Sequence, residues 1–339
     1  MTSPSDPRSN AGASRGAGVG VLDADTAHAM LSSGRGGRGD RVFSGVAMTA
    51  GLLVLAILAL IAWSTTSQAW PAFAEQGISF VTTDDWNPSQ GEFGALAFIY
   101  GTLLSSLIAL IFAVPISLGI ALFTNEAAPR RARKAVIYVM DLLAAIPSVV
   151  YGLWGVLVLA PNLTPVYQWI AGAVGDLPVL GAFFGGPANG RSFMTAGLIL
   201  AIMIIPIITS LSREVIATVP RSQREAAYGM GATRWEMIRY SVIPWSRGGI
   251  VGAVMLGLGR AMGETIAVAL VIGSTAQITT EVFFPGDAMA AVIANQFGEA
   301  SGTFRSALIG LGVVLFVLTI LVNMAARGIV GRFDRRLRA

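Results

Sequence analysis

The sequence predicts an all-α integral membrane protein with six transmembrane helices and both termini in the cytoplasm. Three observations lead to this fold class: a mostly apolar composition, six apolar stretches long enough to cross a bilayer, and a one-sided distribution of arginine. Of the 339 residues, 54% are hydrophobic and 12% are charged, and the mean hydropathy is +0.68. Soluble domains carry about 25% charged residues, so we expect this protein to face lipid.

Six stretches of the chain are long and apolar enough to be spans. A bilayer core of about 30 Å needs roughly 20 apolar residues in helical form. The stretches are 43–63, 94–123, 135–160, 193–212, 248–273 and 304–326. The first run is too long for the apolar region of a signal peptide, about 7–15 residues, so we expect an uncleaved anchor.

The segments outside the spans are polar. Residues 1–41 are rich in Gly, Ser, Ala and Arg without periodicity, and we expect them to form a disordered cytoplasmic lead. The transmembrane domain then covers residues 42–330, and residues 331–339 form a basic cytoplasmic tail.

The basic residues fix the predicted orientation, because Lys and Arg are retained on the cytoplasmic side. With the N-terminus inside, the inner segments hold 20 of the 23 basic residues, and the outer segments hold only Arg191. The net charge of +4 is therefore spread over short loops beside the membrane. We expect contact with membrane lipid and none with nucleic acid.

Several kinds of chemistry are excluded by composition. The chain has no Cys and one His, His28, which excludes thiol chemistry, disulfides and His/Cys metal clusters. Lys134, the single lysine, follows Arg133, so the Gly-Lys-Ser/Thr of a nucleotide-binding P-loop is missing. We expect no catalytic residue, no metal site and no cofactor in this chain.

The inner loop at 216–247 has the character of an ordered helical segment. Ala227, Gly231, Arg234 and Ile238 recur at helical spacing, so one face carries small or apolar residues. Such a face suits either a docked protein or a helix lying on the lipid surface.

Other residues of the loop predict how its helix begins and ends. Glu225 is expected in the first helical turn, where a carboxylate interacts favourably with the helix dipole. Ala226 is small enough to let another backbone approach closely. Pro244 is expected to end the helix before the fifth span begins.

Two charged residues, Arg260 and Glu264, lie within the fifth predicted span. A charge at that depth costs about 2.5–3.5 kcal/mol on insertion scales, so both are expected to face a pore or a partner. Their i, i+4 spacing places them on one stripe. Gly259 and Gly263 form a small-xxx-small face that predicts close helix packing.

We predict that Arg260 and Glu264 line a substrate pathway. A guanidinium binds oxyanions in a bidentate manner, and Glu264 would orient Arg260 or accept the proton of a hydrogen phosphate. The alternative is a self-contained ion pair without contact to a solute.

The loop motif Glu225-Ala226-Ala227-x3-Gly231-x12-Pro244 resembles the EAA loop of the permeases of binding-protein-dependent ABC importers. Ser241 departs from that pattern, which usually has Ile there. The resemblance implies a type I ABC importer (MetI-like) permease fold, in which the loop helix docks into a cleft of the ATPase subunit. It assigns coupling to the ATPase to five residues: Glu225, Ala226, Ala227, Gly231 and Arg234.

A wider resemblance points to the solute. Residues 259–268, Gly-Arg-Ala-Met-Gly-Glu-Thr-Ile-Ala-Val, are similar to the PstC-type permeases of phosphate ABC importers, as are residues 145–155 and 293–300. The similarity runs over about residues 42–335. It implies a permease subunit of an ATP-driven inorganic phosphate importer in a prokaryotic cell membrane, with no enzymatic activity of its own.

The same resemblance implies a set of partners. These are a PstA-like permease subunit completing a heterodimer, two copies of a PstB-like cytoplasmic ATPase that bind ATP and Mg, and a PstS-like extracytoplasmic phosphate-binding protein.

Other interpretations remain open. One is a PstA-type subunit, which shares the loop and the charged pair. Another is a permease of a sulfate, molybdate or phosphonate ABC importer. A third is an ion-coupled secondary transporter that uses Arg260 and Glu264 as a proton relay. Dependence of uptake on a separate ATPase distinguishes the third from the others.

Overall fold

The computed structural model describes residues 38–336, and side chains for residues 39–328. The predicted disordered lead, 1–41, lies outside the described residues except for 38–41, which already belong to a helix. The side chains of the predicted tail, 331–339, also lie outside the described part. The chain divides into two compact units, residues 1–60 and 61–339, and each is described by itself.

Helices and one small hairpin make up the described chain, in agreement with the predicted all-α class. The first unit contributes the start of helix α2, whose side chains are exposed from residue 39 to residue 60. Three π-helical turns, labelled η, adjoin the ends of α-helices. The elements are α2 (Arg38–Gln76), α3 (Ser79–Thr82), β1 (Trp86–Asn87), β2 (Glu92–Phe93), α4 (Leu96–Leu122), η1 (Phe123–Ala127), α5 (Arg130–Ala145), α6 (Ser148–Trp154), η2 (Gly155–Leu159), α7 (Ala160–Val174), α8 (Leu180–Phe184), α9 (Phe193–Ala217), α10 (Arg221–Gly229), α11 (Arg234–Met237), η3 (Ile238–Val242), α12 (Ile243–Met262), α13 (Ile266–Val271), α14 (Met289–Gln296) and α15 (Gly302–Arg336).

Six helical segments of the described chain are long and apolar enough to cross a membrane. They are Gly39–Gln76, Leu96–Ala127, Ser148–Val174, Phe193–Ala217, Arg234–Met262 and Gly302–Gly328. All six overlap the stretches read from the sequence, but the third and fifth are displaced along the chain.

The third span begins later than the sequence analysis placed it. The predicted span, 135–160, is divided at Ile146-Pro147, and the helix crossing the membrane is Ser148–Val174. Ile146 is extended, with φ −68° and ψ 127°, because proline disfavours the helical conformation in the residue before it. Helix α5, which precedes the break, has no buried residue and is not part of the span.

The fifth span begins earlier and ends earlier than predicted. Its helix runs from Arg234 through η3 and α12 to Met262, where the prediction was 248–273. Pro244 does not end a helix, which corrects the prediction, because it occupies the first turn of α12 directly after η3. Within this continuous helix, Pro244 follows a π-helical turn, where the regular i→i−4 hydrogen-bond pattern is already interrupted.

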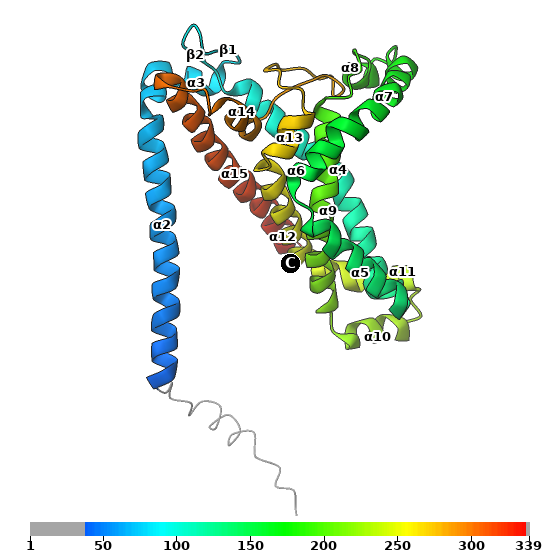
Figure 1. Ribbon diagram of the computed structural model, residues 1–339. Coiled ribbons are helices and arrows are strands. Elements are labelled where there is room, and N and C mark those ends of the chain that lie inside the picture. Colours follow the sequence, from blue (N-terminus) through cyan, green and yellow to red (C-terminus); the bar gives the residue numbers. More distant parts are fainter. Residues whose placement is uncertain (1–37, 337–339) are drawn as a thin grey trace, which may run out of the picture. The chain divides into compact units, whose positions relative to one another are not determined.

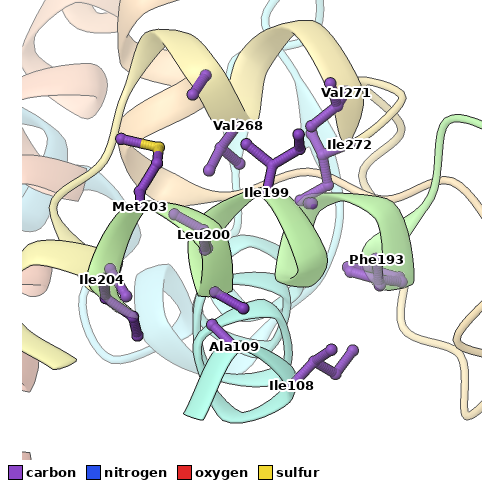
Figure 2. Close-up of a cluster of buried hydrophobic side chains, with 14 of the residues drawn as sticks. Ile108, Ala109, Phe193, Ile199, Leu200, Met203, Ile204, Val268, Val271 and Ile272 are labelled. Carbon is purple, nitrogen blue, oxygen red and sulfur yellow. The ribbon is translucent and has the colours of Figure 1, made fainter. Parts of the chain in front are cut away.

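Helix α9 lies at the centre of the second unit. In its most apolar window 61% of the residues are buried, whereas the other five candidate spans do not exceed 33%. Figure 1 shows α4 and α12 running alongside α9. In Figure 2, Ile199 and Leu200 of α9 lie between Ile108 of α4 and Val268 of α13. A helix that is apolar all round is buried, and the composition of α9 explains its place.

Helices α4 and α9 run parallel in a constant register. Ser117 Oγ donates a hydrogen bond to the carbonyl of Ile205 at 3.2 Å. Two turns further along, Asn125 Nδ2 donates to the carbonyl of Arg213 at 2.8 Å. Both pairs are 88 residues apart, as expected for two spans that cross the membrane in the same direction.

Helix α12 runs antiparallel to α9 and packs closely against it. A Cβ added at Gly249 would come 2.4 Å from Val215, and one added at Gly257 would come 2.7 Å from Ile208. The residue numbers rise on α12 as they fall on α9. Small residues let membrane helices approach in this way, and Gly257 reaches α9 near the middle of its length.

The second unit has two distinct ends. One, the α10 end, carries α10 and α11 and lies at the bottom of Figure 1. The other, the hairpin end, carries β1 and β2, which pair antiparallel with Trp86 opposite Phe93. There Trp86 meets Phe98 edge-on at 5.1 Å, and Phe93 stacks on Phe304 at 6.0 Å. This aromatic cluster joins the hairpin to α4 and α15.

Candidate functional site

Helix α10 ends in a glycine-dependent cap. Gly231 has a φ of +82°, a left-handed conformation that glycine adopts without steric cost. Ala232 N donates to the carbonyl of Ala227 at 3.1 Å, and Gly231 N donates to the carbonyl of Tyr228 at 2.9 Å. These two bonds form a Schellman motif. The x3 spacing between Ala227 and Gly231 is therefore the length that this cap requires.

A second cap starts the next helix. The hydroxyl of Thr233 accepts a hydrogen bond from Glu236 N, while a carboxylate oxygen of Glu236 accepts one from Thr233 N at 2.8 Å. This reciprocal pair is a capping box. The signal, Thr-x-x-Glu, is present in the sequence and was missed there. With the Schellman motif, it fixes the turn between α10 and α11.

The predicted coupling residues lie together on this helix–turn–helix, but their side chains differ in direction. Glu225, Ala226, Gly231 and Arg234 are exposed, whereas Ala227 is buried. Glu225 lies in the second turn of α10, not in the first as predicted, because the helix begins at Arg221. The exposed residues of 225–235 are called the α10 surface below.

Ala227 belongs to the packing that holds α10 in place. It joins a buried apolar cluster with Ile216 at the end of α9, Ile238 and Val242 of η3, and Ala121 of α4. The single continuous helical face predicted from Ala227 to Ile238 does not form, because the cap at Gly231 divides it. Both residues are nevertheless buried in this one cluster.

Large apolar side chains are exposed around the α10 surface. Met230 is 83% exposed and Trp235 63%. Between α10 and the start of α12 lies an open groove of about 490 Å³, whose lining includes Ala226, Tyr240 and Trp245. Exposed apolar groups rimmed by polar ones mark interaction sites. The α10 end therefore combines an open groove with exposed apolar side chains.

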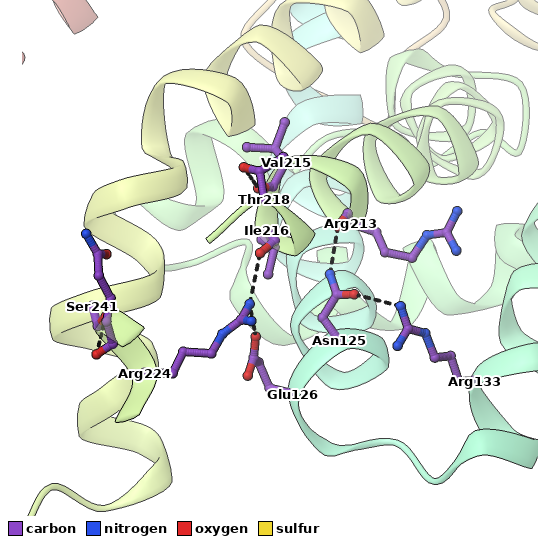
Figure 3. A network of polar contacts seen from close by, with 10 residues as sticks. Asn125, Glu126, Arg133, Arg213, Val215, Ile216, Thr218, Arg224 and Ser241 are labelled. Carbon is purple, nitrogen blue, oxygen red and sulfur yellow. Dashed lines mark hydrogen bonds and ion pairs between the residues drawn. The ribbon is translucent and has the colours of Figure 1, made fainter. Parts of the chain in front are cut away.

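A polar network lies behind α10 (Figure 3). Arg224 Nη2 lies 2.9 Å from a carboxylate oxygen of Glu126, and it donates to the carbonyl of Ile216 at 3.0 Å. Asn125, next to Glu126, accepts a hydrogen bond from Arg133 Nη2 at 3.3 Å. Glu126 and Asn125 lie 98 and 99 residues before Arg224, and no local pattern indicated that these residues meet.

Arg260 and Glu264 lie close together as expected, but they do not share one helical stripe as predicted, because helix α12 ends at Met262. Arg260 Nη2 lies 4.0 Å from Glu264 Oε2, and the side chains are 46% and 8% exposed. Gly257 contacts α9 at mid-length, so Arg260 lies about 4.5 Å beyond that level. At 4.0 Å the contact is an ion pair and not a hydrogen bond. Arg260 therefore offers its donors to the space outside this chain.

The helix is interrupted at Glu264. Helix α12 ends at Met262, and α13 begins at Ile266, so Glu264 lies in an irregular segment. The buried carboxylate lies behind the exposed guanidinium, which suits a residue that orients Arg260.

The face of α12 that carries Arg260 is left uncovered by the rest of the described chain. Gly252, Leu256, Arg260 and Gly263 are exposed at helical spacing. A Cβ added at Gly259 would meet nothing within 4 Å. A Cβ added at Gly263 would meet only the carbonyl of Gly259, at 3.4 Å, so neither glycine packs against another helix of the described residues. We call Gly252, Leu256, Gly259, Arg260 and Gly263 the open stripe.

The α10 surface and the open stripe are separate sites. Arg260 follows Ile243 by 17 positions in a continuous helix, or about 26 Å at 1.5 Å per residue. The two sites are joined by α12, which continues from α11 through η3.

One buried carboxylate at the hairpin end was not singled out from the sequence. Asp287, before α14, is 5% exposed. Burial raises its pKa to about 6, and the hydrogen bond from Ala288 N–H to its carboxylate partly opposes that rise. A Cβ at Gly101 of α4 would collide with the backbone carbonyl of Asp287, so the backbone of Asp287 lies tightly against the span.

Comparison with known proteins places these features in context. Residues 113–339 match the family described as "Binding-protein-dependent transport system inner membrane component". A phosphate transport system permease protein PstC of Mesorhizobium japonicum is 46% identical over 299 residues, covering 88% of this chain and 91% of that protein. PstC of Xylella fastidiosa is 44% identical over 303 residues, covering 89% and 94%.

A solved structure shares the fold. A chain of a bacterial alginate ABC transporter, crystallised with an alginate pentasaccharide-bound periplasmic protein, aligns with a TM-score of 0.56 and 19% identity. The alignment covers 87% of this chain and 97% of that chain.

Proposed function

Because the chain belongs to the binding-protein-dependent transport system inner membrane component family, we propose that it is the permease subunit of an ATP-driven inorganic phosphate importer. It is a multi-pass inner-membrane protein. Relatives that bear the PstC name are 44–46% identical and nearly as long, which supports phosphate as the solute over sulfate, molybdate or a phosphonate.

One observation carries the proposed role of the membrane site. Arg260, two residues before the end of the helix of the fifth span, is half exposed on an open stripe, while its carboxylate partner is buried. A guanidinium in this position presents a planar set of N–H donors that can bind a passing oxyanion in a bidentate manner. The ion pair lowers the cost of holding the charge in the membrane. Because the contact with Glu264 is long, the solute does not have to displace a strong hydrogen bond.

The α10 surface is the proposed contact with a separate ATPase. The fixed turn at Gly231, the exposed Ala226 and the apolar side chains around them give a rigid docking element. ATP-driven movement of the ATPase displaces α10 and α11. Since α11 continues into α12, the displacement reaches Arg260 through one helix. The chain itself performs no chemistry.

The proposed assembly has four kinds of subunit. A PstA-like permease covers the open stripe and completes the pathway. Two PstB-like ATPases bind ATP and Mg at the α10 end, which is therefore cytoplasmic, as the distribution of arginine also indicates. A PstS-like binding protein delivers phosphate at the hairpin end.

Reconstitution of the purified assembly in proteoliposomes tests the proposal. Labelled phosphate should accumulate only with ATP and the ATPase, and excess sulfate should not compete. R260Q should abolish accumulation. R305Q is the matched control, because Arg305 lies over the ring of Phe297 at 5.0 Å, at the hairpin end. Full accumulation by R260Q, or uptake without the ATPase, would refute the proposed function.

A further inference from the structure

Helix α10 contacts the α4 span, although the two helices are far apart in the sequence. It connects directly to α9 before it and to α11 and α12 after it, whereas α4 ends about 100 residues earlier. The ion pair between Arg224 of α10 and Glu126 of η1 is the charged contact between these elements in the described part of the chain. Helix α4 packs along α9 for most of its length.

The pair is partly buried, and its attraction is mainly electrostatic. The side chain of Glu126 is 8% exposed and that of Arg224 is 22% exposed. Within the described residues, Glu126 Oε1 and Arg224 Nε have no aligned hydrogen bond, so the 2.9 Å contact is mainly Coulombic. Separating such a pair leaves an uncompensated charge out of water, which is strongly unfavourable. If α10 moves, Glu126 is therefore constrained to follow Arg224.

The contacts around the pair connect it to further helices. Arg224 Nη2 also donates to the carbonyl of Ile216 at the end of α9. Asn125 donates to Arg213 of α9 and accepts from Arg133 of α5. In Figure 3 these groups converge on η1, the π-helical turn that ends the α4 span. Two adjacent residues of η1 thus tie three neighbouring helices to α4.

We infer that Glu126 and Arg224 are a positioning pair that transmits the displacement of α10 to α4. Neither residue touches solute or nucleotide. The pair makes α4 move with α10, so that the spans on both sides of α9 respond to the ATPase, and not α12 alone. This inference rests on the proposed function, because it requires that α10 is moved by an ATPase.

The test uses the complete assembly in proteoliposomes with the binding protein, and it measures ATP hydrolysed per phosphate accumulated. E126Q and R224Q should each raise this ratio by at least about fivefold, the lower range of typical coupling between sites. The exchange E126R/R224E should bring the ratio back toward wild type. R221Q is the matched control, because Arg221 is exposed on the same helix, and it should leave the ratio unchanged.

A second measurement separates transmission from folding. The chain contains no cysteine, so E126C/R224C introduces the only two thiols in this subunit. The ratio should be high before the thiols are bridged by a short bismaleimide and should fall after bridging, within one preparation. Co-purification of the ATPase shows that each variant assembles.

Three results would overturn the inference. Hydrolysis and uptake could fall together at a constant ratio, which would make the pair purely structural. Bridging could leave the ratio unchanged. The ATPase could be lost from every variant, which would assign the pair to assembly. In contrast, ATP-independent uptake by the wild-type protein would contradict the proposed function itself. This result is measured on the wild type alone, so it is distinguishable from the three results above.

Discussion

The amide of Ala232 donates a 3.1 Å hydrogen bond to the carbonyl of Ala227, and this bond closes the end of α10. It forms only because Gly231, between them, is left-handed at φ +82°. The family motif thus has a physical reason for its glycine: the residue stops the docking helix and turns the chain toward α11.

Replacing that glycine should loosen the docking helix. A left-handed conformation costs a residue with a Cβ about 1–2 kcal/mol, so G231A should lower the free energy of unfolding by about that amount. It should also weaken ATPase binding, measured by co-purification. G229A is the matched control, because Gly229 ends the same helix, has nothing within 4 Å of an added Cβ and is not left-handed. Equal behaviour of the two variants would contradict the role given to the cap.

Two glycines of α12 should respond oppositely to alanine. An added Cβ at Gly257 would come 2.7 Å from Ile208, so G257A should destabilise the isolated subunit by roughly 1–3 kcal/mol, as overpacking does. An added Cβ at Gly259 meets nothing within 4 Å. G259A should therefore melt in detergent like the wild type or slightly higher.

Binding of the second permease subunit should be sensitive to the substitution at Gly259, which leaves the stability of the isolated subunit unchanged. If that second subunit covers the open stripe, G259A should reduce its co-purification. Undiminished heterodimer with G259A would show that the stripe faces lipid or water instead.

Glu264 should contribute to solute discrimination. If its carboxylate accepts the proton of hydrogen phosphate, E264Q loses a charge-assisted hydrogen bond in transit, typically about 1.5–3 kcal/mol. Phosphate uptake should fall roughly tenfold or more, and sulfate should begin to compete. E92Q, at the exposed position of strand β2, is the control. Unchanged uptake and unchanged selectivity in E264Q would leave Glu264 as a partner of Arg260 only.

Asp287 should make stability depend on pH. Its pKa rises from 3.8 to about 6 in the folded protein, so the folded state holds the proton more tightly than the unfolded state. The stabilisation is then fully present below about pH 4 and is lost as pH rises through 6. The shift corresponds to on the order of 3 kcal/mol.

Thermal midpoints in detergent between pH 4 and pH 7 measure this effect. The wild-type midpoint should fall over that range, and that of D287N should stay nearly flat. E299Q, at an exposed position, should keep the wild-type slope. A D287N slope equal to wild type would assign the pH dependence to other groups.

The sequence predicted the parts of the fold that depend on local composition. Apolar runs located six spans, because hydropathy is a property of a few turns of helix. The contact between Arg260 and Glu264 was also predicted, but it forms across the end of α12 and not along one helical stripe. Hydropathy is averaged over a window, so it did not detect the helix break at Ile146-Pro147. There the proline disfavours the helical conformation of Ile146, which ends α5 and moves the start of the third span to Ser148. Hydropathy also passed over the interruption at Glu264, which no proline marks.

Other features depend on tertiary structure that spacing alone does not encode. Glu126 and Arg224 meet only because α4 and α9 run in parallel register, which places η1 beside the start of α10. Gly259 has the spacing of a packing residue, yet the glycine that meets α9 is Gly257. Which face of a small-residue helix is covered depends on its neighbours.

The π-helical turn η3 determines how far α12 is rotated about its axis relative to α11, and hence the direction of Arg260 relative to the α10 surface. A π-turn carries one residue more than the α-helical path would need, and each residue turns a helix by about 100°. Deleting one residue from 238–242 would rotate all of α12 by that angle and draw it about 1.5 Å toward α11. Arg260 would then point in a different direction while the α10 surface stayed in place. A single surplus residue, far from Arg260, thus decides where the guanidinium faces.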